Sequence, residues 1–251
     1  MILAIVQARM TSTRLPGKVL MPVLGKPLIQ HLLERLILSK RIDKIIVATS
    51  QAKESDPLET FVKNLGFEVY RGSEQDVLDR FYKAALQYRP QTVVRITGDC
   101  PLLDAAVCDE VIRVFQKDRL DYAQTGPSFA EGLDCEVFSF QSLERAWKEA
   151  RLKSEREHVT LYLRNHPEFI KSKMLINGTD DSKYRLTLDE KDDYCVVKAI
   201  FEGLQGEGKK DFSMKEVKSF LDAHPEIYQV NAHIIRNEGL QRSLSEEGGV
   251  E

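Results

Sequence analysis

The chain lacks the sequence features of several large classes of protein. Its four cysteines include no Cys-x-x-Cys pair, which argues against a zinc site or a disulfide framework and favours reduced thiols. Its net charge of -3 at pH 7 gives no overall attraction to nucleic acid or anionic lipid. The apolar run Met1–Val6 is too short to span a bilayer. We therefore expect a cytoplasmic protein that binds neither nucleic acid nor membrane.

The chain does contain a regular alternation of apolar and amphipathic segments. Its 251 residues are enough for one large α/β domain. Short apolar runs alternate with stretches of helical spacing, in the pairs 2–8 and 28–38, 44–49 and 58–65, 68–70 and 77–88, and 92–96 and 105–115. This pattern predicts a three-layer, Rossmann-like α/β fold with a mostly parallel sheet and helices on both faces. The carboxyl ends of the strands would form one ligand-binding edge.

The pattern is less regular after residue 118. Residues 121–140 predict a strand, a loop and a second strand, whereas 141–150 and 155–165 have helical spacing. A strand pair is expected next, followed by two helices, at residues 169–176, 184–188, 192–203 and 214–223. The tail from Glu238 to Glu251 is rich in Glu, Ser and Gly and is expected to be flexible. We predict a single domain over residues 1–237, with an excursion at about 120–180.

The loop after the first strand is rich in groups that bind phosphate. Residues 7–18, with the sequence QARMTSTRLPGK, contain three cations, three hydroxyls and one glycine. Backbone donors and guanidinium groups suit the spread charge of a triphosphate. An ordinary solvated loop is the alternative, but the position after the first strand favours phosphate binding. The expected nucleotide contacts in this loop are Ala8, Arg9, Ser12, Thr13, Arg14, Gly17 and Lys18.

This loop matches neither of the two commonest phosphate-binding motifs. It is not a Walker A loop, because Gly25-Lys26 is followed by Pro27 rather than by serine or threonine. It also lacks the G-x-G-x-x-G of a dinucleotide fold. These two mismatches leave nucleotidyl transfer as the main candidate chemistry.

Several segments resemble one known family. Ala8-Arg9, residues 12–18 and residues 25–29 of this chain resemble the opening signature of a family. That family is the CMP-sugar synthetases. These cytidylyltransferases activate acidic sugars such as 3-deoxy-manno-octulosonate and sialic acid. Residues 71–82 and 155–160 resemble segments of the spore-coat polysaccharide biosynthesis branch. The likeness runs in order through residues 1–205.

The resemblance implies a fold, a reaction and partners. The fold would be that of the nucleotide-diphospho-sugar transferases, with the region 120–180 serving sugar binding and homodimer formation. The reaction would transfer CMP from CTP to a sugar hydroxyl with release of pyrophosphate, in surface polysaccharide biosynthesis. Arg9, Arg14 and Lys18 would then be catalytic, because they would hold the triphosphate while Lys18 stabilises the departing pyrophosphate.

Two aspartates are candidate ligands for Mg²⁺. Asp99 follows the fourth predicted strand and Asp189 a later one, and Mg²⁺ is commonly held by one or two carboxylates plus water and phosphate. Taken alone, each could instead be a helix N-cap. The resemblance favours the metal, since these two positions match the family's metal-binding aspartates. The second match lacks a proline found in the family, so Asp192 is a rival of Asp189.

The remaining site predictions concern nucleotide and acceptor contacts. We assign Thr97 and Gly98, which precede Asp99, to the nucleotide. The resemblance adds Arg71 and Ser73, although a simple turn at Gly72 would also explain that segment. For the acceptor sugar the expected contacts are Asp134, Glu136 and His158. The first two could equally be exposed strand residues, and His158 a structural histidine.

Two other functions stay open. A glycosyltransferase that uses a nucleotide sugar would share the nucleotide-binding half, but such enzymes commonly carry an Asp-x-Asp metal motif, and this chain has none. A nucleotide-binding protein without catalytic activity is the third possibility. The presence of both Lys18 and Asp99 argues against it.

Overall fold

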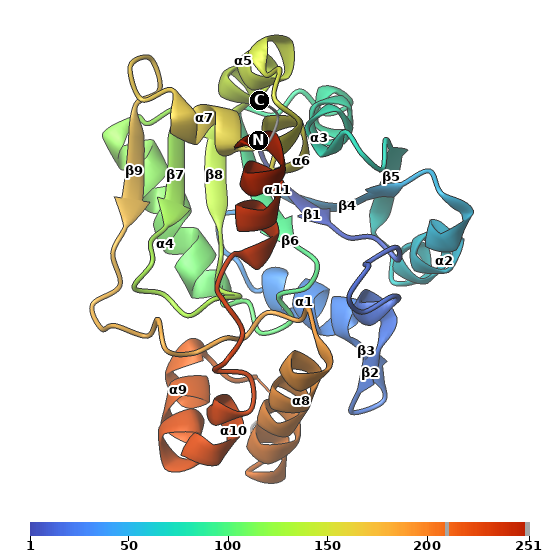
Figure 1. The fold of residues 1–251 in the computed structure, drawn as a ribbon, viewed down its shortest axis with the longest axis vertical. Helices are drawn as coiled ribbons and strands as arrows, with labels where there is room; N and C mark the ends of the chain where they lie inside the picture. The colour runs from blue at the N-terminus through green and yellow to red at the C-terminus, as the bar shows by residue number, and fades with distance from the viewer. Residues whose placement is uncertain (209–210, 249–251) are drawn as a thin grey trace.

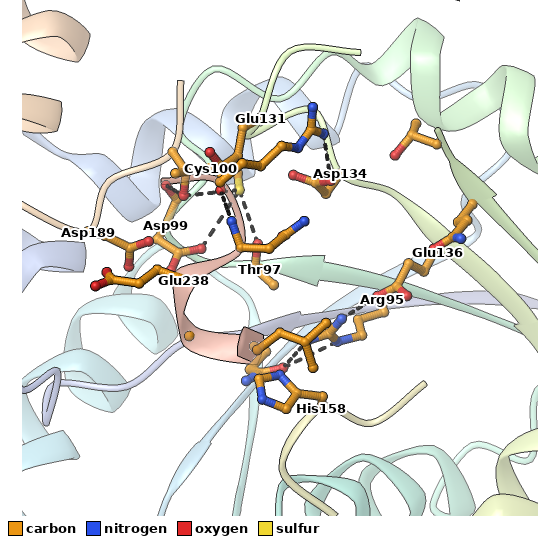
Figure 2. Close-up of a pocket in the computed structure, with 18 of the residues that line it drawn as sticks. Arg95, Thr97, Asp99, Cys100, Glu131, Asp134, Glu136, His158, Asp189 and Glu238 are labelled. Atoms are coloured by element: carbon orange, nitrogen blue, oxygen red, sulfur yellow. Dashed lines mark hydrogen bonds and ion pairs between the residues drawn. The ribbon is translucent and has the colours of Figure 1, made fainter. Parts of the chain in front are cut away.

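The apolar segments of the first hundred residues form parallel strands, as predicted. The structure, a computed structural model, describes residues 1–208 and 211–248. Its 7-stranded sheet has the order β5-β4-β1-β6-β8-β7-β9 (Figure 1). The strands are β1 Ile2–Gln7, β4 Lys44–Ser50, β5 Glu68–Gly72, β6 Thr92–Thr97, β7 Tyr122–Thr125, β8 Glu136–Ser139 and β9 Ser172–Leu175. Within this sheet β8 runs antiparallel to β6 and β7, and the other pairings are parallel. A pocket lies where β6 ends (Figure 2).

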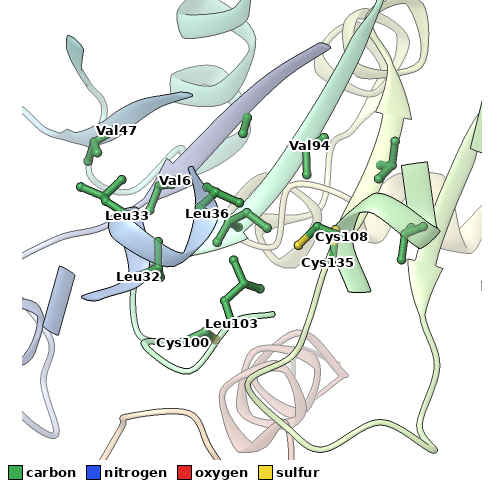
Figure 3. Packing of buried hydrophobic residues seen from close by; sticks show 14 of the residues in the cluster. Val6, Leu32, Leu33, Leu36, Val47, Val94, Cys100, Leu103, Cys108 and Cys135 are labelled. Carbon is green, nitrogen blue, oxygen red and sulfur yellow. The ribbon is translucent and has the colours of Figure 1, made fainter. Parts of the chain in front are cut away.

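Helices cover both faces of the sheet, because apolar residues occupy both sides of its strands. Ala4 and Val6 of β1 pack with helices α1, α2 and α4 on one face (Figure 3). Leu3 and Ile5 pack with α3, α5 and α7 on the other. These helices are α1 Leu28–Leu36, α2 Asp56–Asn64, α3 Val77–Leu86, α4 Ala105–Asp118, α5 Phe140–Glu149 and α7 Leu161–Asn165. The predicted three-layer α/β fold is confirmed.

A third hydrophobic cluster lies beside the sheet. Helices α8 (Lys191–Gly206) and α9 (Met214–Ala223) pack there against Leu102, Leu133 and Leu186. The short helix α10 (Pro225–Gln229) follows α9. A small hairpin of β2 (Pro22–Val23) and β3 (Lys26–Pro27) precedes α1, after a 3-10 turn at Lys18–Leu20, and a second such turn, Lys53–Ser55, precedes α2. Among the described residues, no helix combines the length and apolar character needed to cross a membrane.

The strand expected at residues 184–188 does not form. This segment makes an isolated bridge between Arg185 and Glu131. Leu186 N–H then donates to Glu131 O (2.7 Å), whereas Leu188 N–H donates to Asp99 O (2.8 Å). Because its partners belong to two different loops, the segment has no neighbouring strand along which a ladder could continue.

The helix expected at residues 155–165 is divided in two. Helix α6 covers Lys153–Glu157, and α7 begins at Leu161. Between them Val159 has a φ of 45°, which lies in the left-handed region and interrupts an α-helix. The break sends the chain in a new direction at His158, which is one of the predicted acceptor contacts.

The C-terminal tail contains a helix that was not expected. Residues Glu238–Gly248 form helix α11, residues 249–251 lie outside the described part, and the flexibility of the tail stays a prediction. The helix packs beside α6, where Glu247 accepts hydrogen bonds from the Ser154 N–H and hydroxyl (both 2.6 Å). This segment is held by polar partners that are distant in sequence. Its composition alone could not reveal these partners. The domain boundary at residue 237 stays a prediction.

Candidate active site

The predicted phosphate loop follows β1 and folds back on itself. Gly17 N–H donates to Met10 O (2.9 Å), and Gly17 has a φ of 72°, which glycine adopts without strain. The Ser12 hydroxyl accepts a hydrogen bond from Leu15 N–H (3.4 Å). A 3-10 turn then starts at Lys18. The closed loop directs the Lys18 side chain back toward the edge of the sheet.

Lys18 binds both of the predicted metal ligands. Its Nζ lies 2.7 Å from Asp99 Oδ2, 2.8 Å from Asp189 Oδ1 and 2.6 Å from Leu188 O. Although burial opposes its charge, the two carboxylates raise the pKa of Lys18 above its usual value. Burial likewise opposes the charge of Asp99, yet Lys18 lowers the pKa of Asp99 below its usual value. Lys18 and Asp99 are therefore both ionised at neutral pH.

The sheet brings Asp99 to this point. Gly98 N–H donates to Gln7 O (2.7 Å), so the loop after β6 lies against the end of β1. A Cβ atom at position 98 would come within 2.7 Å of the Ala8 Cβ. Glycine at 98 is therefore required by close packing of the two strand ends, which places Asp99 opposite the phosphate loop.

A buried ionic network holds Asp189. The Arg185 guanidinium binds Asp193 at 2.8 Å and Glu131 at 2.6 Å, and it lies 3.3 Å from Asp189 Oδ2. Burial disfavours the charged form of Arg185, but its carboxylate partners together outweigh burial and raise the pKa of Arg185 above its usual value. The fully buried Asp193 accepts hydrogen bonds from the N–H groups of Asp189 (2.9 Å) and Glu190 (3.0 Å). Arg185 and Asp193 thus fix the position of Asp189 without a strand.

The carboxylates of Asp99 and Asp189 fit a magnesium ion. Both converge on the position of one ammonium group, and oxygen is the ligand atom that Mg²⁺ prefers. The described residues contain no cluster of three or more side chains that could hold a metal ion. The rival Asp192 is half exposed and lies 3.8 Å from His233 instead. The geometry therefore favours Asp189 over Asp192.

Two adjoining cavities open beside these groups. The larger is about 550 Å³ and the smaller about 330 Å³, and we call them the large and small cavities. Arg9, Arg14, Asp99 and Asp189 line both. The small cavity is also lined by Ala8, Ser12, Thr13 and Lys18. The predicted phosphate loop and the predicted metal ligands thus share one space.

The two loop arginines differ in their partners. Arg14 binds Asp189 Oδ1 (3.0 Å) and Glu238 Oε2 (2.6 Å). Within the described part of the chain, the Arg9 guanidinium has neither a hydrogen bond nor an ion pair, although it lines both cavities. An unpaired guanidinium on a cavity wall is available to an anionic ligand.

The large cavity extends to the predicted acceptor residues. Asp134 and His158 line it, together with Arg95 and Arg164. Asp134 accepts a hydrogen bond from Gly132 N–H (2.9 Å), and desolvation raises its pKa. Burial lowers the pKa of His158, whose Nε2 lies 3.0 Å from the Ser243 hydroxyl. Asp134 and His158 can therefore face a ligand in this cavity.

Glu136 also lines the large cavity, and its carboxylate is bound by several protein donors. Its carboxylate accepts hydrogen bonds from Arg95, Tyr122 and Thr160. Burial opposes its charge, but Arg95 and Arg164 lower the pKa of Glu136 to about 2. These donors take most of the hydrogen-bonding capacity of the carboxylate, so Glu136 holds Arg95 in place, and its contact with the acceptor sugar stays a prediction.

The structure does not bring Arg71 and Ser73 to either cavity. Arg71 binds Asp56 (2.6 Å) and Glu59 (2.7 Å), and so fastens β5 to α2. The Ser73 hydroxyl accepts a hydrogen bond from Asp76 N–H (3.0 Å) before α3. The sequence signals were the family resemblance and their position after the third predicted strand, and neither could show where the side chains point.

Another arginine of this segment is fully buried near the phosphate loop. Arg80 NH1 donates to Ser73 O (2.9 Å), but its Nε and NH2 have no partner within the described part of the structure. Burial, and then repulsion by Arg9, lower the pKa of Arg80 to about 10. Sequence reasoning missed Arg80, Arg95, Arg164 and Arg185, because each depends on partners that are distant along the chain.

Comparison with known proteins shows which family this chain resembles. The family model described as cytidylyltransferase matches residues 3–236. An uncharacterized protein of Methanocaldococcus jannaschii is 38% identical over 93% of this chain and 95% of its own length. The spore coat polysaccharide biosynthesis protein SpsF of Bacillus subtilis is 36% identical over 90% of this chain and 95% of its own length.

Solved structures agree with this grouping. A cytidylyltransferase from Leptospira borgpetersenii has a TM-score of 0.86 and 35% identity, over 91% of this chain and 96% of that chain. A CMP:2-keto-3-deoxy-manno-octonic acid synthetase complexed with CTP shares the fold, with a TM-score of 0.64 and 17% identity over 80% of this chain and 98% of that chain. Fold and site together define an α/β nucleotidyltransferase. More specifically, the chain belongs to the cytidylyltransferase family.

Proposed function

We propose that this enzyme transfers CMP from CTP to a hydroxyl group of a sugar and releases pyrophosphate. The observation that carries the proposal is the position of Lys18, at the junction of the phosphate loop and the two carboxylates. The relatives support CTP and a sugar, since one is named for spore coat polysaccharide biosynthesis and the fold is shared with a CMP-sugar synthetase in complex with CTP. An acidic sugar for a surface polysaccharide is the acceptor class that we infer.

In the proposed mechanism Asp99 and Asp189 hold Mg²⁺, which would neutralise phosphate charge. Arg9 binds the triphosphate with its unpaired guanidinium, and Arg14 exchanges carboxylate partners for phosphate oxygens. Lys18 leaves the carboxylates and stabilises the negative charge that develops on pyrophosphate. The sugar hydroxyl attacks the α-phosphorus in line, and the bond to pyrophosphate breaks. The large cavity, with Asp134 and His158, positions the acceptor.

A cytoplasmic location, a homodimer built on residues 120–180, and nucleotide contacts from Thr97 and Gly98 are further parts of the proposal. The family resemblance supports the location and the dimer. Thr97 has direct structural support, because it lines both cavities. Gly98 acts through its close packing against Ala8.

The test measures pyrophosphate release from a panel of nucleoside triphosphates, with Mg²⁺ and a set of acidic and amino sugars. We expect release with CTP that requires both an acceptor and Mg²⁺. Release with ATP or dTTP in preference to CTP would contradict the cytidylyl assignment. Release of a free nucleotide from a nucleotide sugar, without pyrophosphate, would indicate a glycosyltransferase instead.

A further inference from the structure

Helix α11 lies across the proposed nucleotide site. Glu238 and Gly239, at its start, line both the large and the small cavity. Ser243, one turn further on, lies in the wall of the small cavity. Figure 2 shows Glu238 beside Asp99 and Asp189, and Figure 1 shows α11 in front of the sheet near β6 and β8. A ligand of the phosphate loop therefore meets α11.

Glu238 occupies a position suited to a phosphate group. Its Oε2 lies 2.6 Å from NH1 of Arg14, one of the three cations of the phosphate loop. A guanidinium group binds carboxylates and phosphates through the same pairs of N–H donors. Arg14 therefore presents to Glu238 the donor that a nucleotide would need.

The side-chain attachments of α11 are polar, and the hydrogen bonds among them are partly buried. The helix is held by Glu247 on Ser154 and by Ser243 on His158, with a weaker pair at 3.7 Å between Glu246 and Lys153. None of its residues that the structure describes is fully buried. A segment with few buried apolar contacts opens at low free-energy cost, because such contacts supply most of the local stability.

The segment before α11 is held more firmly. Arg236 NH1 donates to Pro127 O and Phe129 O, both at 2.9 Å. Asn237 N–H donates to Glu131 Oε1 (3.1 Å), and Asn237 has a φ of 56°. The chain is thus fixed up to residue 237 and turns there. This arrangement lets α11 move about Asn237 while its N-terminal anchor stays in place.

We propose that α11 is a displaceable cover of the nucleotide site, in which Glu238 holds Arg14 until a polyphosphate takes its place. The inference rests on the proposed binding of a triphosphate by the phosphate loop. According to this inference, Glu238 lowers the affinity for nucleotide, whereas the residues of the phosphate loop raise it. Nucleotide binding moves α11 away from Arg14, and release of product lets Glu238 return.

The first experiment compares full-length wild type with Glu238→Gln, which keeps the side-chain shape and removes its charge. Binding of CTP and of inorganic tripolyphosphate, without Mg²⁺, is measured by calorimetry. We expect Glu238→Gln to bind both roughly tenfold more tightly, within the usual range of coupling between competing ligands. The matched control is Glu226→Gln, which removes the same charge from an exposed side chain outside both cavities. It should change affinity less than about twofold.

Unchanged or weaker binding by Glu238→Gln, with its thermal unfolding temperature preserved, would overturn the inference. An equal gain in Glu226→Gln would also overturn it, because general charge would then explain the effect. If wild type binds tripolyphosphate but not CTP, the proposed function fails, while the competition by Glu238 is still measured. If neither variant binds either ligand, both proposals fail.

A second experiment follows the helix itself by hydrogen exchange. Addition of CTP to the wild type should speed exchange of the backbone amides of residues 239–248, because Glu238 is displaced. The amides of β1 should be unchanged or slower. Slower exchange throughout α11 would show that the helix closes on the nucleotide, which contradicts displacement.

Discussion

The phosphate end and the acceptor end of the site are built in different ways. At the phosphate end, Lys18 and Asp99 come from loops that directly follow β1 and β6, two neighbouring parallel strands. At the acceptor end, Glu136 of β8 joins Arg95 of β6 and Thr160 from the break between α6 and α7. Strand topology thus positions Lys18 and Asp99, and buried ion pairs between distant segments position the acceptor end, as they do Asp189. The predictions below test this contrast, beginning with the largest expected effect.

Apart from the loss expected at Lys18, which is treated last, the largest expected effect concerns the second metal ligand. Asp189→Asn should raise the Mg²⁺ concentration for half-maximal activity by at least about tenfold, because one carboxylate of the converging pair is lost. Asp192→Asn is the matched control, since Asp192 faces His233 and lies outside both cavities. A Mg²⁺ titration of pyrophosphate release measures both variants. A larger rise in the Mg²⁺ requirement for Asp192→Asn than for Asp189→Asn would make Asp192 the ligand. It would contradict the assignment of Asp189 to the metal at the phosphate end.

The next prediction asks whether the buried network positions Asp189. Asp193→Asn removes the charge that binds Arg185 and the backbone at 189. We expect a Mg²⁺ requirement raised about tenfold, typical of residues that orient metal ligands, with the KM for CTP little changed. Binding of Mn²⁺ measured by electron paramagnetic resonance provides a readout independent of turnover. Lower thermal stability with normal metal affinity would show a merely structural role.

At the acceptor end, Glu136 should contribute to stability in a pH-dependent way. Its pKa is lowered from 4.5 to about 2, so its contribution is present above pH 4.5 and is lost as pH falls toward 2. A shift of this size corresponds to on the order of 3 kcal/mol. Urea unfolding of wild type and Glu136→Gln should show a gap in free energy of unfolding that narrows below pH 4.5.

The control for this pH effect is Glu110→Gln, which removes an exposed pair with Arg113. It should give a gap of at most about 1 kcal/mol at any pH. If the difference in free energy of unfolding between wild type and Glu136→Gln stays constant from pH 7 to pH 3, the buried ion pair does not stabilise the acceptor end.

The smallest expected effect concerns Arg71. Because its guanidinium binds Asp56 and Glu59 away from the cavities, Arg71→Gln should leave the KM for CTP within about twofold of wild type. Its free energy of unfolding should fall by no more than about 1 kcal/mol, as for other partly exposed pairs. Steady-state kinetics and urea unfolding measure the two quantities. A large rise in KM would restore the nucleotide contact that the family resemblance implies.

The same contrast explains what the sequence could predict. The sheet, the phosphate loop and Asp99 follow from local patterns, because apolar strands and the polar residues after them are adjacent in the chain. The prediction of a strand before Asp189 was wrong, because residues 184–188 form hydrogen bonds with two loops rather than with one strand. Helix α11 and the role of Glu136 depend on partners tens of residues away, which spacing along the chain does not encode.

The central claim is that Lys18 acts where the phosphate loop meets the two carboxylates. The most direct measurement is the rate of CTP-dependent pyrophosphate release by Lys18→Met, compared with Lys26→Met. Lys26 belongs to the same N-terminal segment but pairs with Glu34 at the surface. The account predicts a loss of about 10²–10³-fold for Lys18→Met and little change for Lys26→Met. A folded Lys18→Met enzyme that works at the wild-type rate would contradict it.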